Sequence, residues 1–264
     1  MLLAINVNNT HTLLGVYDRD RLAVHWRLRS DPARTIDEYG VLFRGLFADW
    51  GVAHPEITGV ILSSVVPPMN DRMEQVCRRF FGHTPLVVGP GIRTGVSIIM
   101  DNPREVGADR IANAVAAYER TRSATIVVDF GTATTFDYVT PKGEYLGGVI
   151  VPGIGISLDA LIARTAKLPR VELARPGKVV ARNTVASMQA GLVYGYAGMV
   201  DALVERIRAE VEPVWGSAAR CIATGGLAAL IAPTATSIEA VDEFLTLDGL
   251  RIIYERNDGG SDGS

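Results

Sequence analysis

The 264-residue sequence has little cysteine, few aromatic residues and no excess of positive charge. Its two cysteines, Cys77 and Cys221, stand far apart and form no CxxC pair, which argues against a disulfide framework and a zinc knuckle. The net charge of −3 and the pI near 5.8 leave no sequence-wide basic field, so we expect no nucleic-acid and no membrane partner. Any anionic ligand must therefore be held locally.

Long hydrophobic runs are also missing. The longest uncharged apolar stretch, residues 146–158, is broken by Pro152 and several glycines, and it is too short to span a bilayer. The start of the chain has no basic flank and only a short apolar stretch, which is too little for a signal peptide. All four histidines lie in the first third, which argues against a histidine-dependent triad that draws on the later chain. We expect a compact cytoplasmic protein.

The patterns that are present indicate an α/β fold. Strands at 2–7 and 12–17, with a third that ends near residue 28, predict a three-strand meander. Thr35 and Glu38 have capping-box spacing, and apolar residues at helical intervals predict a helix that ends before Gly51. Further alternation follows, with a strand at 57–65, a helix at 70–81, a strand at 86–88 and a helix from about 103 to 121.

The pattern then restarts. Residues 126–136 align with residues 3–13, so that Asn6 matches Asp129 and Thr12 matches Thr135. We therefore predict an internal duplication with halves at 1–118 and 119–256. The second half continues with helices at 155–164 and 184–210, a strand at 221–223 and a helix that ends near Ile231, while residues 257–264 are expected to form a disordered tail.

The two strand–turn units are candidate phosphate sites. Residues 6–12 and 129–135 each put hydroxyls, amides and backbone N–H groups directly after a buried strand, and such turns can wrap phosphate oxygens. A single turn of this kind is more often an ordinary hairpin turn. Two related copies, the second with a carboxylate and a Gly-Thr pair, favour two half-sites that clamp one nucleotide across a cleft.

The segment 101–110 is dense in charge at a predicted helix start. Pro103 suits the first turn of this helix, with Asp101 or Asn102 as its N-cap. Asp109 and Arg110 are either solvated surface charges or a pair that activates a hydroxyl and holds an anion. The small neighbours Gly107 and Ala108 favour the second interpretation, because a glycine inside a helix costs up to about 1 kcal/mol. For the glycine-rich segment 147–153 a packing bend and a phosphate approach remain equally open, and Asn183 is expected to be a plain helix cap.

Several motifs occur together in one order along the chain: Asn9-Thr10, Asp101-Asn102-Pro103 with Gly107-Ala108-Asp109-Arg110, Asp129-Phe130-Gly131-Thr132, Gly147-Gly148 through Pro152-Gly153, Asn183-Thr184, and Ala223-Thr224-Gly225-Gly226. In these motifs, from Leu2 to about Arg256, the chain resembles a type III pantothenate kinase. The resemblance implies two ribonuclease H-like halves of the actin–hexokinase–Hsp70 superfamily with a nucleotide cleft between them. It also implies a homodimer that uses ATP to phosphorylate pantothenate to 4'-phosphopantothenate, the first step of coenzyme A synthesis.

The resemblance also implies roles for individual residues. Asp109 would be the base that accepts the proton of the pantothenate hydroxyl. The pantothenate pocket would be lined by Gly107, Ala108 and Arg110, and Thr184 would contact pantothenate near the dimer interface. Asp129 would hold a monovalent cation, potassium or ammonium. ATP, with Mg²⁺ carried on it, would bind Thr132 and the turn formed by Asn6, Val7, Asn8, Asn9, Thr10, His11, Thr12 and Leu13.

One position departs from the family pattern. The usual turn reads Asp-x-Gly-Asn-Thr, whereas this chain has Asn6-Val7-Asn8-Asn9-Thr10, so a negative charge expected near the magnesium-bearing phosphates is absent. This motivates a second hypothesis, a catalytically weakened relative that binds nucleotide or pantothenate and acts as a regulator. A third is a kinase for another small hydroxylated acid. The retained Asp109 favours an enzyme, because a protein that only binds has no need of a base.

Overall fold

The computed structural model describes residues 1–51 and 56–258, and these form two compact units. The first unit contains Met1–Val96, Asp101–Ala116 and the C-terminal helix α7 (Leu245–Asp258), and the second contains Ser97–Met100 and Ala117–Phe244. This division is not the pair of contiguous halves expected from the sequence, because the chain returns to its first unit at the end. Among the described residues, no helix combines the length and the apolarity that a membrane span requires.

The first unit is built on a five-stranded sheet in the order β3-β2-β1-β4-β5. Its strands are β1 (Leu2–Val7), β2 (His11–Asp18), β3 (Arg21–Arg29), β4 (Gly59–Ser64) and β5 (Leu86–Val87). The first three form the predicted antiparallel meander, and β4 pairs parallel to both β1 and β5. The carboxyl ends of β1 and β4 therefore lie side by side, with Asn6 directly opposite Ser63.

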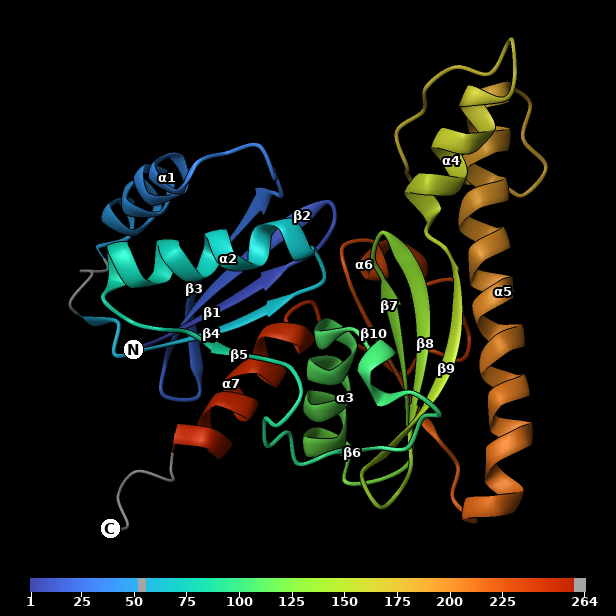
Figure 1. The fold of residues 1–264 in the computed structure, drawn as a ribbon. Helices are drawn as coiled ribbons and strands as arrows, with labels where there is room; N and C mark the ends of the chain where they lie inside the picture. Colours follow the sequence, from blue (N-terminus) through green and yellow to red (C-terminus); the bar gives the residue numbers. More distant parts are fainter. Residues whose placement is uncertain (52–55, 259–264) are drawn as a thin grey trace. The chain divides into compact units, whose positions relative to one another are not determined.

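Helices cover both faces of this sheet (Figure 1). Helix α1 (Ile36–Asp49) begins at the predicted Thr35–Glu38 capping box, and α2 (Pro67–Val76) continues into a π-helical turn at Cys77–Phe81. Both pack on the face that carries Leu3 and Ile5. The opposite face meets α7, because a side chain at Gly59 would overlap Tyr254 and one at Gly15 would lie 2.9 Å from the Leu247 Cδ1 atom.

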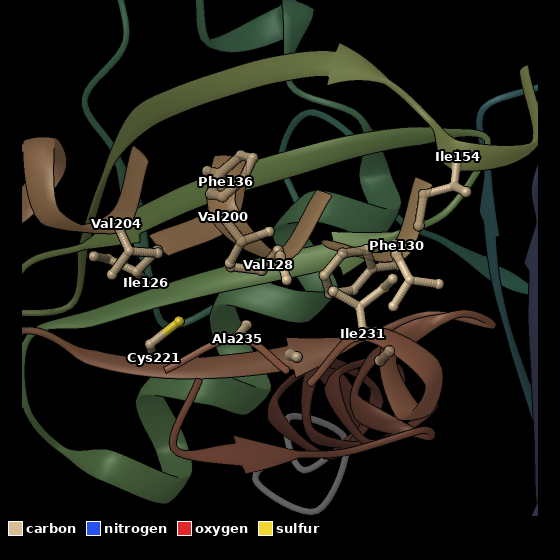
Figure 2. Packing of buried hydrophobic residues seen from close by; sticks show 14 of the residues in the cluster. Ile126, Val128, Phe130, Phe136, Ile154, Val200, Val204, Cys221, Ile231 and Ala235 are labelled. Carbon is tan, nitrogen blue, oxygen red and sulfur yellow. The ribbon is translucent and has the colours of Figure 1, made fainter. Parts of the chain in front are cut away.

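The second unit repeats this sheet. Its order is β11-β10-β7-β8-β9-β6, formed by β6 (Ser97–Ile98), β7 (Thr125–Phe130), β8 (Ala133–Val139), β9 (Glu144–Pro152), β10 (Arg220–Thr224) and β11 (Ala240–Val241). Helices α4 (Ile154–Ala163), α5 (Thr184–Trp215) and α6 (Ala228–Ile231) contribute to its core. Figure 2 shows this core, where Ile126, Val128 and Phe130 of β7 point toward Val200 and Val204 of α5 and Ile231 of α6.

The two sheets share one topology, as the predicted duplication requires. In each, a three-strand antiparallel meander continues through a parallel strand beside its first strand, with β7, β8, β9, β10 and β11 equivalent to β1 through β5. The strand register corrects one detail of the alignment. Asn6 pairs with Leu13, whereas Asp129 pairs with Thr135, so the first hairpin is one residue longer and Thr135 corresponds to Leu13 rather than to Thr12.

Several element boundaries differ from the sequence-based prediction. Helix α2 begins at Pro67 rather than near Asn70, because proline is tolerated in the first helical turn. The predicted helix from Pro103 is interrupted: a 3-10 turn at Pro103–Glu105 ends at an extended Val106, and α3 (Ala108–Thr121) begins afterwards. The disordered tail expected from residue 257 onward starts too early in the chain, because α7 still includes Asn257. Residues 259–264 lie outside the described part of the chain.

Candidate active site

The first unit positions Asp109 at the end of a parallel strand. Asp109 is the second residue of α3, it is partly buried, and its Oδ1 atom accepts the backbone N–H of Arg110 at 2.8 Å. A side chain at Gly107 would come within 2.6 Å of this oxygen and 3.3 Å of Val65, which directly follows β4. Ligands of open α/β sheets bind at the carboxyl ends of the strands, so Asp109 lies where a substrate of this unit is expected.

The space that the missing side chain of Gly107 leaves is therefore taken by the Asp109 carboxylate itself. Gly107 does not lie inside a helix: it precedes α3, and its carbonyl oxygen accepts the N–H of Ile111 at 3.1 Å. The helix penalty used in the sequence argument does not apply here. Gly107 instead leaves room for the carboxylate, which a Cβ at this position would displace.

The turn after β1 is held in shape by Ser30. The Ser30 hydroxyl donates to the Asn8 carbonyl oxygen at 2.6 Å and lies 2.9 Å from the Thr12 hydroxyl, and the Ser30 N–H donates to the Thr10 carbonyl oxygen. The side chains of Val7 and Thr12 are fully buried, whereas Asn9, Thr10 and His11 are exposed. Partial desolvation of the ring and the nearby Arg27 lower the pKa of His11, which favours the neutral imidazole. The exposed face of the turn therefore consists of neutral side chains and backbone.

Asn6 and Ser63 form a buried polar pair with unsatisfied hydrogen bonds. Asn6 is 1% exposed and Ser63 is fully buried, and they sit opposite each other on β1 and β4. Within residues 1–51 and 56–258, the amide nitrogen and oxygen of Asn6 and the hydroxyl of Ser63 have no hydrogen-bond partner. Buried polar groups are nearly always satisfied, so this pair fits a site completed by water or by a hydrated ligand.

The second unit surrounds Asp129 with backbone. Asp129 is next to last in β7 and lies opposite Thr135 on one side and Thr224 on the other. Gly225 has a φ of +91°, and a Cβ there would lie 2.5 Å from the Asp129 Oδ1 atom. A side chain at Gly153 would overlap the carbonyl oxygen of Thr132, which accepts the Gly153 N–H at 3.1 Å. The glycines at 153 and 225 therefore serve close backbone packing around this turn.

The donor set at Asp129 fits a hard cation. In the described part of the chain, no three His, Cys, Asp or Glu side chains gather as metal ligands. The Asp129 carboxylate is partly buried, and a carboxylate oxygen is a ligand type that hard cations prefer.

The other predicted residues are not all brought together. Thr184 is exposed at the first turn of α5, where Asn183 is the predicted cap and accepts the Ala186 N–H at 2.8 Å. Tyr196, twelve residues later on α5, donates to the carbonyl oxygen of Pro152 at 2.8 Å. Thr184 therefore lies about 18 Å along the helix axis from Tyr196, the residue that contacts Pro152 beside Gly153.

Two buried features were not predicted as functional, and the structure assigns them structural roles. Burial raises the pKa of both Cys77 and Cys221 to about 12, so neither thiol is a nucleophile near neutral pH. The fully buried Asp137 accepts hydrogen bonds from Tyr145 at 2.6 Å and from Thr135 at 3.0 Å. Its carboxylate is satisfied within the sheet.

Comparison with known proteins decides the family. The family model described as type III pantothenate kinase matches residues 2–206. The chain belongs to the type III pantothenate kinase family. Relatives with that name include those of Geobacter sulfurreducens, 59% identical over 97% of this chain and 99% of the relative, and of Myxococcus xanthus, 58% identical with the same coverage.

Solved structures agree on the fold. A Baf family transcriptional activator from Campylobacter jejuni has a TM-score of 0.60 at 17% identity, and the alignment covers 97% of this chain and 99% of the other. A 2-dehydro-3-deoxygalactonokinase protein from Sinorhizobium meliloti has a TM-score of 0.51 at 10% identity, with 100% and 98% coverage. At these identities the likeness shows the fold alone. It is the actin-like ATPase and sugar kinase fold that the pantothenate kinase resemblance implied.

Proposed function

We propose that this protein transfers the terminal phosphoryl group of ATP to the hydroxyl of pantothenate and so forms 4'-phosphopantothenate, the first step of coenzyme A synthesis. The observation that carries the proposal is the Asp109 carboxylate, partly buried at the start of α3 beside the end of β4, in a member of this kinase family. A partly buried carboxylate at such a strand end suits a general base.

In the proposed reaction Asp109 accepts the proton of the pantothenate hydroxyl while the hydroxyl oxygen attacks the terminal phosphorus of ATP, the bond from that phosphorus to the bridging oxygen breaks, and ADP leaves. Gly107 leaves room for this carboxylate, Ala108 is buried at the start of α3, and Arg110, the next residue of α3, supplies positive charge for the pantothenate carboxylate or for the transferring group. Phosphoryl transfer depends mainly on positioning and charge stabilisation. A single base with a neighbouring guanidinium is therefore a sufficient set on the acceptor side.

In the first unit the turn Asn6–Leu13 is the proposed nucleotide contact, and in the second unit it is Thr132. The exposed, neutral face of the first turn and the exposed Thr132 hydroxyl offer donors to phosphate oxygens. Mg²⁺ bound on ATP neutralises phosphate charge, and the orphaned Asn6 Oδ1 atom fits a hydrated magnesium ion, which keeps most of its water ligands. Potassium or ammonium is assigned to Asp129.

The position of Thr184 supports the proposal of a homodimer. Thr184 lies far along α5 from the Gly153 turn, which suits a contact with pantothenate bound by a partner subunit. Exposed apolar side chains gather on the same segments, with Ile156 and Leu161 on α4, Val179 and Val180 before α5, and Val185 beside Thr184. Exposed apolar clusters of this kind are typical of protein–protein interfaces.

The test is a coupled assay with ATP, magnesium, potassium and pantothenate. We expect turnover by the native protein and a loss of roughly a hundredfold or more in Asp109→Asn, with pantothenate binding retained by calorimetry. Glu119→Gln is the matched control, because this carboxylate lies near the other end of α3 and bonds Arg122. Full turnover in Asp109→Asn would refute the base assignment.

Two outcomes would favour the other hypotheses. Binding of nucleotide or pantothenate without turnover would indicate a regulator, although the relatives at 58–59% identity bear the kinase name. Turnover of another hydroxylated acid in preference to pantothenate would indicate a different acceptor.

A further inference from the structure

The C-terminal helix α7 packs directly on the helix that carries Asp109. The Thr246 hydroxyl donates to the Asn113 Oδ1 atom at 2.7 Å, and both residues are buried, with Thr246 7% exposed. A Cβ at Gly249 would overlap the carbonyl oxygen of Ala112. One buried hydrogen bond and one backbone contact therefore join α7 to α3, although 133 residues separate Thr246 from Asn113.

These contacts lie one helical turn beyond Asp109. Asp109 and Asn113 are four residues apart, so they share a face of α3, and Ala112 is the residue beside Asn113. A helix moves as a rigid element over such a distance. A shift or rotation of α3 at Asn113 is therefore transmitted to the Asp109 carboxylate.

The other side of α7 is fixed to the sheet. The Tyr17 hydroxyl of β2 donates to Asp248 at 2.7 Å, and Tyr254 packs against Gly59 of β4. At the helix end, the Asn257 amide bonds both the carbonyl oxygen and the N–H of Arg93. Figure 1 shows α7 beside α3 under the sheet of the first unit. The helix thus connects α3 to β2 and to β4, and the end of β4 carries Ser63.

We propose that α7 positions the catalytic base, with Thr246 and Gly249 as positioning residues that act through Asn113 and Ala112. The inference rests on the proposed role of Asp109. Thr246 sets the rotation of α3 by its hydrogen bond, and Gly249 sets the depth at which α3 packs.

The expected effects follow from the size of each disturbance. Gly249→Ala forces the backbones of the two helices apart, and a misplacement of about 1 Å at a reacting group can lower the rate by about a hundredfold. Thr246→Val keeps the shape of the side chain and removes the hydroxyl, so we expect a smaller fall in kcat, on the order of tenfold. Thr246→Ser retains the hydroxyl and should restore most of kcat.

The closing experiment compares these variants with Tyr17→Phe by steady-state kinetics. Tyr17→Phe removes a hydrogen bond of the same length that holds α7 to β2 without touching α3. We expect Thr246→Val to lower kcat while KM for ATP and pantothenate stays within about twofold, a pattern that marks an interaction made in the transition state. Tyr17→Phe should lower the melting temperature and keep kcat. If Gly249→Ala fails to fold, Thr246→Val carries the test.

Hydrogen exchange gives a readout independent of turnover. Thr246→Val should speed exchange of the α3 amides, whereas Tyr17→Phe should leave them protected. Equal kcat values for Thr246→Val, Tyr17→Phe and the native protein, with equal exchange in α3, would overturn the positioning role. If Asp109→Asn keeps full turnover, the base assignment fails and the positioning role fails with it. A normal loss in Asp109→Asn beside an unaffected Thr246→Val rejects the positioning role alone.

Discussion

The substitution Asn6→Asp restores the aspartate that is usual in the family, and the structure allows its effect to be worked out in both the free and the ligand-bound protein. Asn6 is 1% exposed beside the fully buried Ser63, and the hydrogen-bonding groups of both side chains lack partners in the described residues. A neutral orphaned group costs about 1–3 kcal/mol. An ionised carboxylate in the same place is a buried, uncompensated charge.

Leaving one charge buried without a partner costs about 3–5 kcal/mol. We therefore expect Asn6→Asp to lower the free energy of unfolding of the nucleotide-free protein by that amount, unless the new carboxyl group takes up a proton and becomes neutral. For a chain of this size the fall in melting temperature is on the order of 10 °C. Mg²⁺ on bound ATP supplies the missing positive charge, so the nucleotide should stabilise Asn6→Asp more than it stabilises the native protein.

The assay is thermal unfolding with and without magnesium and ATP, followed by steady-state kinetics. Asn6→Asp should show the larger rise in melting temperature on adding Mg-ATP, with a lower KM for ATP or a higher kcat and little change in KM for pantothenate. Asn6→Ala is the control for lost volume, because it removes the amide without adding charge and should gain nothing extra from Mg-ATP. Equal nucleotide effects in the native protein and in Asn6→Asp, with unmoved ATP kinetics, would show that this position is not on the metal side of the phosphates.

Two further predictions concern the cation and the assembly. Activity should depend on potassium or ammonium, because a partly buried carboxylate surrounded by backbone is stabilised by a bound cation. The Asp129→Ala variant should lose this dependence together with most of the activity. Equal rates of the native protein in sodium-only buffer would contradict the prediction. The native protein should run at twice the 28.3 kDa chain mass in light scattering, and Leu161→Asp on α4, 40% exposed, should yield a monomer with weakened pantothenate binding. Val214→Asp, at the far end of α5 and 73% exposed, should stay dimeric, and a dimeric Leu161→Asp would place the interface elsewhere.

The repeated sheet was predictable because its signal is local. Each meander is a run of consecutive strands joined by short turns, and the apolar pattern of residues 2–7 recurs at 125–130. The capping box at Thr35 likewise lies within four residues of chain. Such features are determined by neighbours in the sequence, which is why the helix α1 and the strands β1, β2 and β7 agree with the prediction.

The elements that escaped prediction depend on distant partners. Strands β6 and β11 have two residues each and exist through pairing with β9 and β10. Helix α7 does carry apolar residues at helical spacing, such as Leu250, Ile253 and Tyr254, but Gly249 weakens the helical signal in the middle of the segment. That glycine is explained only by the carbonyl oxygen of Ala112, which approaches from a distant part of the sequence.

The site residues divide in the same way. The motif around Gly107 and Asp109 is recognisable from the sequence, but the reason for the glycine is not, because it depends on the Asp109 carboxylate that lies against Gly107 in the fold. The turn at Asn6–Leu13 stays a predicted nucleotide site, and within it Val7 and Thr12 are buried, so any contribution of these two residues to a ligand can come only through the backbone. A sequence pattern proposes a segment, whereas burial decides which of its atoms are available.

The strand register of the two sheets identifies equivalent positions that carry different side chains. Asn6 and Asp129 occupy the same place, and so do their parallel-strand neighbours Ser63 and Thr224. One residue further on, the first unit has Ser64 and the second has Gly225 with a φ of +91°. In the second unit, a Cβ on Gly225 would lie 2.5 Å from the Asp129 Oδ1 atom, so only a residue without a side chain fits against this carboxylate.

That difference fits a division of labour between the two copies. A carboxylate that backbone closely approaches can take part in binding a potassium or ammonium ion, whereas its negative charge repels a phosphate group. The strand end of the first unit has a neutral amide, an unsatisfied hydroxyl and an exposed turn of neutral donors, so it suits an anion with its own metal ion. Exchanging Gly225 for alanine would put a methyl group against the Asp129 carboxylate in a backbone conformation that alanine rarely adopts, and the cation site should be lost while the first unit keeps its turn intact.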